Sequence, residues 1–281
     1  MDLLEVKGLC KRYDGFLLDH VSFSLSPGYI MGFIGRNGAG KTTTIKSILN
    51  LIKKDAGEVY INGLPFDANE TECKLMTGFV TGAFDCYKKS TIKKLTTVTR
   101  RFYDSWDEEA YRGYLSRFSL DENKKISELS AGMRVKYALA LALCHNARLL
   151  ILDEPTSGLD PVSRDDLLDI FRSVIADGEH SILFSTHIIS DLEKCADYIT
   201  YIKNGRLIGS SDVPSFCDGY RLVSGENEVL SEKLPHMIGY KSGAFGFTAL
   251  IRSEDEKYFS DCRTAPADLE SIMIYTEQEE K

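Results

Sequence analysis

The segment GRNGAGKT, residues 35–42, constrains this chain more than any other part of the sequence. It fits the pattern G-x-x-x-x-G-K-[ST], in which glycines let backbone N–H groups converge on the β-phosphate of a nucleotide. The apolar run IMGFIG precedes the loop, and Ile45, Ile48, Leu49 and Ile52 follow it at the spacing of one helix face. A buried strand, a glycine loop and a helix N-terminus in this order predict a cradle for nucleotide phosphates.

The residue types of this loop indicate which part of the nucleotide each side chain would contact. Lys41 is expected to reach the β- and γ-phosphates, and the Thr42 hydroxyl to bind Mg²⁺. A glycine turn without function is the alternative, but the flanking strand and helix favour the cradle. The residues expected to bind the nucleotide are consecutive: Gly35, Arg36, Asn37, Gly38, Ala39, Gly40, Lys41, Thr42 and Thr43.

A second apolar run, RLLILDEP at residues 148–155, ends in two acids. Asp153, at the carboxyl end of the expected strand, is placed to hold Mg²⁺ through water. Glu154 would then reach the attacking water, as a general base or as a water-orienting group. Acids also end strands where a chain simply returns to solvent. Because a phosphate cradle is present in the same chain, we favour the functional interpretation.

A second candidate anion site lies in LSAGM, which combines a serine hydroxyl, a glycine and an expected helix N-terminus. Its residues are Leu129, Ser130, Ala131, Gly132 and Met133. One nucleotide has no use for both sites within a single subunit, because Lys41 already holds the same phosphate. Two subunits that face each other can use both, each loop closing over the ATP of its partner. The sequence therefore predicts a two-fold dimer with two buried ATP molecules.

Three further residues are weaker candidates, and each has a structural alternative. His187 follows the apolar run HSILFST and could contact the γ-phosphate, although a single histidine is more often structural. Asp160, in TSGLDP, could be only the cap of a helix whose first residue is proline. Tyr13, in KRYDG, could stack on a nucleotide base or simply pack against its neighbours.

Apolar runs that alternate with helical patterns predict an α/β core around a largely parallel sheet. The runs expected as strands are IMGFIG, GEVYING, TGFVTG, RLLILD and HSILFST. Residues 84–128 interrupt the alternation with charged and aromatic residues, which favours an inserted helical subdomain at about 84–145. The Asn-Gly pair in IKNGRLIG predicts a tight hairpin that closes the main domain. We expect one domain over residues 1–210 and a small separate unit over 211–281.

Composition narrows the class of protein. The longest apolar run, YALALALC, is far shorter than the roughly 20 residues of a membrane helix. Seven cysteines without CxxC spacing argue against a disulfide framework, so we expect a cytosolic chain with reduced thiols. The net charge is −8, of which residues 211–281 carry −7, from 14 acidic and 7 basic residues. This distribution argues against nucleic-acid binding, and the acidic tail could simply aid solubility.

The segments GRNGAGKT, LSAGM, LILDEP, SGLD and STH resemble, in order and approximate spacing, those of the ATP-binding cassette (ABC) ATPases. The resemblance covers about residues 1–209, and LSAGM is similar to the family signature LSGGQ. It implies a P-loop NTPase (RecA-like) core with an antiparallel β subdomain and a helical insert, followed by a small α+β extension. It implies Tyr13 as the adenine-stacking residue, Glu154 as the catalytic base, and His187 as a γ-phosphate switch. Asp160 would make a contact across the dimer.

The same resemblance implies ATP and Mg²⁺ as cofactors, a second cassette in a homodimer or heterodimer, and a separate membrane permease. The permease would dock by a short helix beside the helical subdomain, which would place this chain on the inner face of the cell membrane. Among subfamilies, the chain is most similar to bacterial exporters of antibiotics or peptides, so a drug, peptide or lipid-like cargo is expected. A soluble cassette ATPase of translation or DNA repair is the alternative, although the chain has one cassette and no sustained heptads. A regulatory module without turnover is a third class, against which the Asp153–Glu154 pair argues.

One position departs from the family pattern. After TGFVTG the family usually has a glutamine, or less often an acid, that reaches the metal and the attacking water. Alignment places Gly82 there, which has no side chain, and Asp85 is the alternative. If Gly82 is correct, the loop gains backbone freedom, and slow turnover is expected from the isolated chain.

Overall fold

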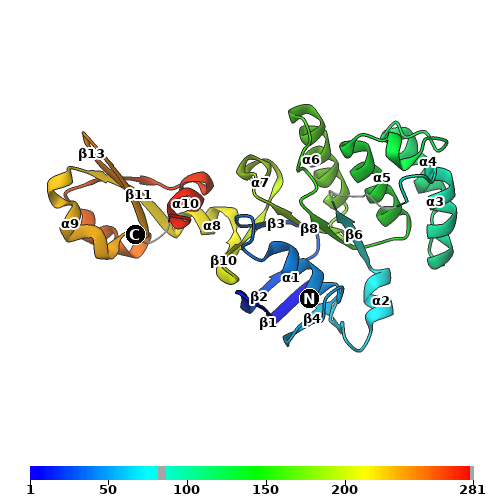
Figure 1. The fold of residues 1–281 in the computed structure, drawn as a ribbon, viewed down its shortest axis with the longest axis horizontal. Coiled ribbons are helices and arrows are strands. Elements are labelled where there is room, and N and C mark those ends of the chain that lie inside the picture. Colours follow the sequence, from blue (N-terminus) through cyan, green and yellow to red (C-terminus); the bar gives the residue numbers. More distant parts are fainter. Residues whose placement is uncertain (82–86, 279–281) are drawn as a thin grey trace. The chain divides into compact units, whose positions relative to one another are not determined.

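The computed structural model describes residues 1–81 and 87–278 and divides the chain into two compact units, Met1–Ile208 and Gly209–Lys281 (Figure 1). The first unit contains two sheets and the second unit one, and each unit has a buried apolar cluster of its own. Gly82 and Asp85, the two candidates for the glutamine position, lie outside the described residues.

A six-stranded sheet forms the centre of the first unit, in the order β10-β9-β3-β8-β7-β6. The strands from β9 to β6 run parallel to their neighbours. All residues of β3 and β8 are buried, as expected for strands that are covered on both faces. These strands are β3 (Ile30–Ile34), β6 (Thr77–Thr81), β7 (Leu149–Asp153), β8 (Ser181–Thr186), β9 (Tyr198–Lys203) and β10 (Arg206–Asp212). The predicted α/β core is confirmed.

A second, antiparallel sheet of the first unit has the order β2-β1-β4-β5. It contains GEVYING, which forms a strand as predicted but belongs to this sheet rather than to the parallel one. Its strands are β1 (Leu4–Tyr13), β2 (Phe16–Leu25), β4 (Ala56–Ile61) and β5 (Leu64–Pro65).

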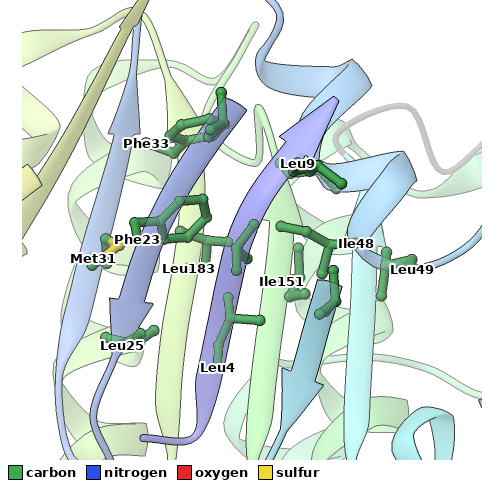
Figure 2. Close-up of a cluster of buried hydrophobic side chains, with 14 of the residues drawn as sticks. Leu4, Leu9, Phe23, Leu25, Met31, Phe33, Ile48, Leu49, Ile151 and Leu183 are labelled. Atoms are coloured by element: carbon green, nitrogen blue, oxygen red, sulfur yellow. The ribbon is translucent and has the colours of Figure 1, made fainter. Parts of the chain in front are cut away.

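Helix α1 (Lys41–Ile48) packs between the two sheets and helps to form one continuous core. Ile48 and Leu49 belong to one buried cluster that joins the two sheets, as Figure 2 shows. The antiparallel sheet contributes Leu4 to this cluster, and the parallel sheet contributes Ile151 and Leu183. Because α1 begins directly after the glycine loop, this core fixes the position of the loop. The spacing of Ile45, Ile48 and Leu49 is thus explained by burial.

The helical part of the first unit follows β6 and the short helix α2 (Glu70–Leu75). It comprises α3 (Ile92–Thr99), η1 (Arg100–Phe102), α4 (Glu108–Arg117), η2 (Ile126–Glu128) and α5 (Ala131–Cys144). A buried hydroxyl network joins the three longest helices, because Thr96 Oγ1 lies 2.8 Å from the Tyr111 hydroxyl and 2.9 Å from that of Tyr137. Tyr111, one of the aromatic residues that interrupt the strand pattern, thus serves as an interior polar link. Helices α6 (Pro161–Ile175) and α7 (Ile189–Cys195) complete the unit.

The second unit contains an antiparallel sheet of order β12-β13-β11-β14. Val223, Phe247, Ala249, Ile251 and Phe259 form its buried cluster. Its elements are α8 (Val213–Asp218), β11 (Tyr220–Gly225), η3 (Asn227–Val229), α9 (Leu230–Lys233), η4 (Leu234–His236), β12 (Gly239–Gly243), β13 (Gly246–Arg252), η5 (Ser253–Phe259), β14 (Arg263–Pro266) and α10 (Leu269–Thr276). In neither unit does a helix of the described residues have the length and apolarity needed to cross a membrane.

Candidate functional site

The glycine loop connects β3 to α1 at the carboxyl edge of the parallel sheet. A Cβ atom on Gly35 would lie 2.4 Å from the carbonyl oxygen of Ile202, so only glycine fits against the neighbouring strand. Gly40 caps α1 with φ 114°, a conformation that side chains strongly disfavour. The loop therefore turns sharply into the helix, and its backbone N–H groups and the helix N-terminus face the same space.

Lys41, the first residue of α1, is a buried cation directly after the glycine loop, with 5% of its surface exposed. Its Nζ donates to the carbonyl oxygen of Gly35 at 2.7 Å and lies 3.1 Å from Glu154 Oε1. A buried ammonium needs such partners, because loss of hydration is costly. These contacts hold the positive charge where the phosphates are expected.

Thr42 and Asp153 are in direct contact, although they are 111 residues apart in the chain. The Thr42 hydroxyl donates to Asp153 Oδ2 at 2.9 Å, and Ser185 Oγ donates to Asp153 Oδ1 at 2.7 Å. A hydroxyl and a carboxylate side by side are the oxygen ligands that Mg²⁺ prefers. The residues predicted to hold the metal thus fit it, and Ser185 is an additional residue that the sequence analysis missed.

Glu154 lies between the loop lysine and the histidine after β8. Its Oε2 lies 2.9 Å from His187 Nδ1, while its Oε1 faces Lys41. The backbone of Glu154 is left-handed, with φ 50°, and its N–H donates to Ser185 Oγ at 2.9 Å. Non-glycine residues that are held in this conformation concentrate at functional sites. The two predicted catalytic side chains, Glu154 and His187, therefore lie together beside the glycine loop.

These residues border a cavity of about 320 Å³. Of the residues predicted to bind nucleotide, Gly35, Ala39 and Tyr13 are not among the described residues that line it. Tyr13 is 46% exposed and pairs across the β1–β2 hairpin with Phe16, which does line the cavity. The stacking role of Tyr13 therefore stays a prediction, and Phe16 is a second candidate. The lining residues are Phe16, Arg36, Asn37, Gly38, Gly40, Lys41, Thr42, Thr43, Glu154, Ser157 and His187.

The second candidate anion site forms a helix start, but away from this cavity. Ser130 is exposed and caps α5 by accepting the N–H of Met133 at 3.2 Å. Among the described residues that line the cavity, none comes from 129–133. A Cβ atom on Gly132 would lie 3.7 Å from the Ser163 side chain, so this segment packs beside the start of α6. Within one subunit the two anion sites are therefore separate.

Asp160 caps α6, as the structural alternative for this residue predicted. It accepts the backbone N–H of Val162 at 3.1 Å and of Ser163 at 3.0 Å, and Pro161 is the first residue of the helix. The hydrogen bonds of Ser163, from its side chain and its backbone, hold the pKa of the Asp160 carboxyl below its usual range. Since the cap is exposed, the predicted contact across a dimer stays a prediction.

The sequence matches the model of the ABC transporter family over residues 18–157. Nod factor export ATP-binding protein I of Burkholderia orbicola is 34% identical over 212 residues, 73% of this chain and 69% of that protein. ABC transporter ATP-binding protein YtrB of Bacillus subtilis is 29% identical over 97% of both chains. A solved ATP-binding subunit of an ABC transporter aligns with a TM-score of 0.68 and 29% identity, covering 76% of this chain and 91% of its own.

Fold and cavity together define a P-loop ATPase cassette. The chain belongs to the ABC transporter family, as an ATP-binding subunit. It is an ATPase coupled to transport. Cassettes of this family dimerise and act with membrane permease components.

Proposed function

We propose that this chain powers export through a separate membrane permease, with two cassettes closing over two ATP molecules. The observation that carries the proposal is the separation of the two anion sites. Lys41 and Glu154 border the cavity, whereas Ser130 is exposed and lies outside it. A second cassette that supplies Ser130 from outside would complete the site, as a two-fold arrangement allows.

The side chains around the cavity support one route of hydrolysis. The β- and γ-phosphates bind the loop N–H groups and the Lys41 ammonium group. The phosphates therefore compete with Glu154 for Lys41. Glu154, still held by His187, then accepts a proton from water, whose oxygen bonds to the γ-phosphorus as the bond to the leaving ADP oxygen breaks. Thr42 and Asp153 would hold Mg²⁺, which neutralises phosphate charge when it is bound.

A groove beside the helical part supports the proposed docking of a permease. Two neighbouring cavities, of about 320 and 440 Å³, share Tyr87, Leu95, Thr99 and Tyr103 among their walls. Val98 and Phe102 border the second cavity and are 47% and 73% exposed. Large exposed apolar side chains beside a groove are typical of a protein interaction site. A short helix from the permease is the proposed occupant.

Similarity to known proteins supports the proposed direction of transport and class of cargo. The relative from Burkholderia orbicola is an ATP-binding protein of Nod factor export. We therefore propose export, with a drug, a peptide or a lipid-like compound as the cargo and with the chain on the inner face of the cell membrane. A soluble ABC ATPase of translation or DNA repair is not favoured, because the reported relatives are transporter subunits.

Co-expression with the membrane protein encoded beside this chain tests the proposal. We expect the two to purify together, and inside-out vesicles that carry both to accumulate cargo when ATP is supplied outside. Phe102→Asp should abolish co-purification but preserve basal ATPase activity, whereas Phe245→Asp, which alters an exposed phenylalanine of the second unit, should preserve both. Co-purification with ribosomes or DNA, and with no membrane protein, would favour the soluble alternative.

A further inference from the structure

Three side chains that commonly bind metals meet on the antiparallel sheet, outside the nucleotide cavity. Cys10 comes from β1, and Asp19 and His20 come from β2. Their ligand atoms, one sulfur, one carboxylate oxygen and one ring nitrogen, all lie within 4.8 Å of one another. No other group of this kind occurs within residues 1–81 and 87–278. None of the three residues has a role in the nucleotide site.

An irregularity in the β1–β2 pairing brings the three residues together. Leu9 pairs with Val21 and Lys11 pairs with Leu18, so Cys10 alone faces both Asp19 and His20. Consecutive residues of a regular strand point to opposite faces, but a bulge re-aims its extra residue. His20 has φ 50°, the left-handed conformation that produces this turn. The bulge therefore places two adjacent side chains on the same face as Cys10.

Local contacts hold the sulfur, the imidazole and the carboxylate in place. The backbone N–H of His20 donates to Cys10 Sγ at 3.3 Å, which fixes the position of the sulfur atom. His20 Nδ1 lies 2.7 Å from Asp19 Oδ1, while Arg206 Nε lies 3.1 Å from Asp19 Oδ2. One carboxylate oxygen is thus held by arginine and the other faces the imidazole. In a tetrahedral zinc site, neighbouring ligand atoms are roughly 3.3–3.6 Å apart, so small side-chain movements suffice.

A cavity beside the three side chains leaves room for a fourth metal ligand. The three residues border a cavity of about 400 Å³, together with Arg12, Leu17 and Asp55. Asp55 accepts from Lys11 Nζ at 3.0 Å and from the Arg12 backbone N–H at 2.7 Å, so its carboxylate offsets the charge of Lys11. Three protein ligands of mixed sulfur, nitrogen and oxygen type with an open fourth position match the preferences of Zn²⁺.

We propose that Cys10, Asp19 and His20 bind one zinc ion, with water as the fourth ligand. The site is connected to the glycine loop by two backbone hydrogen bonds. Asp19 N–H donates to Gly205 O at 2.8 Å, and Gly205 N–H donates to Ala39 O at 2.9 Å. Zinc bound here stabilises the folded antiparallel sheet, because the ligands meet only in the folded chain.

Titration of the full chain with ZnCl₂ tests the proposal, with ADP and excess Mg²⁺ present to occupy the nucleotide cavity. We expect one equivalent of zinc to bind and to raise the melting temperature. Cys10→Ser and His20→Asn should each weaken zinc binding about tenfold or more, as loss of one of three ligands predicts. Asparagine tolerates the left-handed conformation, so His20→Asn removes the imidazole and preserves the bulge. Cys217→Ser and His236→Ala, which alter the second unit, should have no effect.

Co²⁺ gives a direct readout of the ligands, because a thiolate bound to Co²⁺ produces a charge-transfer absorption band. The wild-type chain should show this band, and Cys10→Ser should lose it while keeping its circular dichroism spectrum. Absence of the band from the wild type, or zinc binding that is unchanged in both Cys10→Ser and His20→Asn, would overturn the assignment.

Discussion

Ser185 and Asp153 lie opposite each other on the parallel strands β8 and β7, and the serine hydroxyl donates to Asp153 Oδ1 at 2.7 Å. The same oxygen of Ser185 accepts the N–H of Glu154 at 2.9 Å. One buried hydroxyl therefore positions both the proposed metal ligand and the proposed base. This relationship depends on strand register, because the two residues are 32 positions apart.

Ser185→Ala removes both hydrogen bonds and should lower the ATPase rate and raise the Mg²⁺ concentration needed for half-maximal activity. A hydrogen bond to a charged group contributes about 1.5–3 kcal/mol, so the free energy of unfolding should fall by a similar amount. Steady-state ATPase assays over a range of Mg²⁺ and urea denaturation measure the two effects. Ser181→Ala is the matched control, because Ser181 is a buried serine of the same strand that donates to Ser26 O. Its ATPase activity should stay normal. Equal Mg²⁺ dependence in both variants would refute the positioning role.

Glu154→Gln should bind ATP but lose hydrolysis by about 10²–10⁴-fold, the usual contribution of a general base. Glutamine has nearly the shape of the Glu154 side chain but accepts no proton. The substitution also removes the carboxylate that competes with the phosphates for the Lys41 ammonium group. The variant should therefore accumulate as an ATP-bound dimer. Size-exclusion chromatography with and without ATP, alongside a phosphate-release assay, measures both properties. Glu193→Gln, at an exposed position of α7, is the control. Turnover at the wild-type rate would exclude Glu154 as the base.

Ser130→Arg should abolish turnover while nucleotide binding by the monomer stays almost intact, because Ser130 lies outside the cavity of its own subunit. Mixing this variant with Lys41→Ala should restore one competent site per mixed dimer. Asp107→Ala controls for the loss of a helix cap, which costs about 1 kcal/mol, because Asp107 caps α4 in the same way. Fluorescent-nucleotide binding and ATPase assays of the mixtures provide the measurement. Weak nucleotide binding by the Ser130 monomer would show that the loop acts within its own subunit.

Asp191→Asn should make stability depend less on pH. Burial raises the pKa of the Asp191 carboxyl, and Arg164 Nε lies 3.8 Å from its Oδ1. A raised pKa means that the folded state binds the proton more tightly than the unfolded state does. Stability contributed by this group is therefore lost as pH rises from about 4 through the folded-state pKa.

The asparagine variant has no such loss, so its free energy of unfolding relative to that of the wild type should increase with pH. Urea denaturation at several pH values between about 4 and 7 measures this difference. Asp169→Asn, an exposed carboxyl of α6, should show no comparable trend. A difference between Asp191→Asn and the wild type that stays constant with pH would contradict the prediction.

Gly205→Ala should destabilise the chain more than Gly15→Ala does. Both glycines occupy left-handed hairpin positions, with φ 77° and 78°, which cost alanine about 1–2 kcal/mol. A Cβ atom on Gly205 would also lie 1.9 Å from Leu17 O, whereas nothing lies within 4 Å of one on Gly15. Because Gly205 N–H donates to Ala39 O, ATP affinity should fall as well. Thermal unfolding and nucleotide titration compare the variants. Similar melting temperatures for Gly205→Ala and Gly15→Ala would exclude the clash.

The sequence alone determined the local elements that carry the chemistry. The apolar run before GRNGAGKT, the helical spacing after it and the Asn-Gly hairpin all express short-range rules of burial and backbone conformation. The fold class, the family and the ATPase activity follow from these segments, and the comparisons confirm them. The acids of RLLILDEP were recognisable because they end a continuous apolar run. Gly82 and Asp85 remain candidates from sequence alone.

The tertiary structure decided everything that depends on register between distant strands. Ser185 acquires its position from the pairing of β8 with β7, and Phe16 reaches the cavity because the β1–β2 hairpin ends there. GEVYING belongs to the antiparallel sheet because it pairs with β1. These two segments are far apart in the sequence, so neither segment by itself indicates the pairing. The bulge that gathers Cys10, Asp19 and His20 is likewise a property of two paired strands. No local pattern encodes such contacts, since they are selected by packing of the whole core.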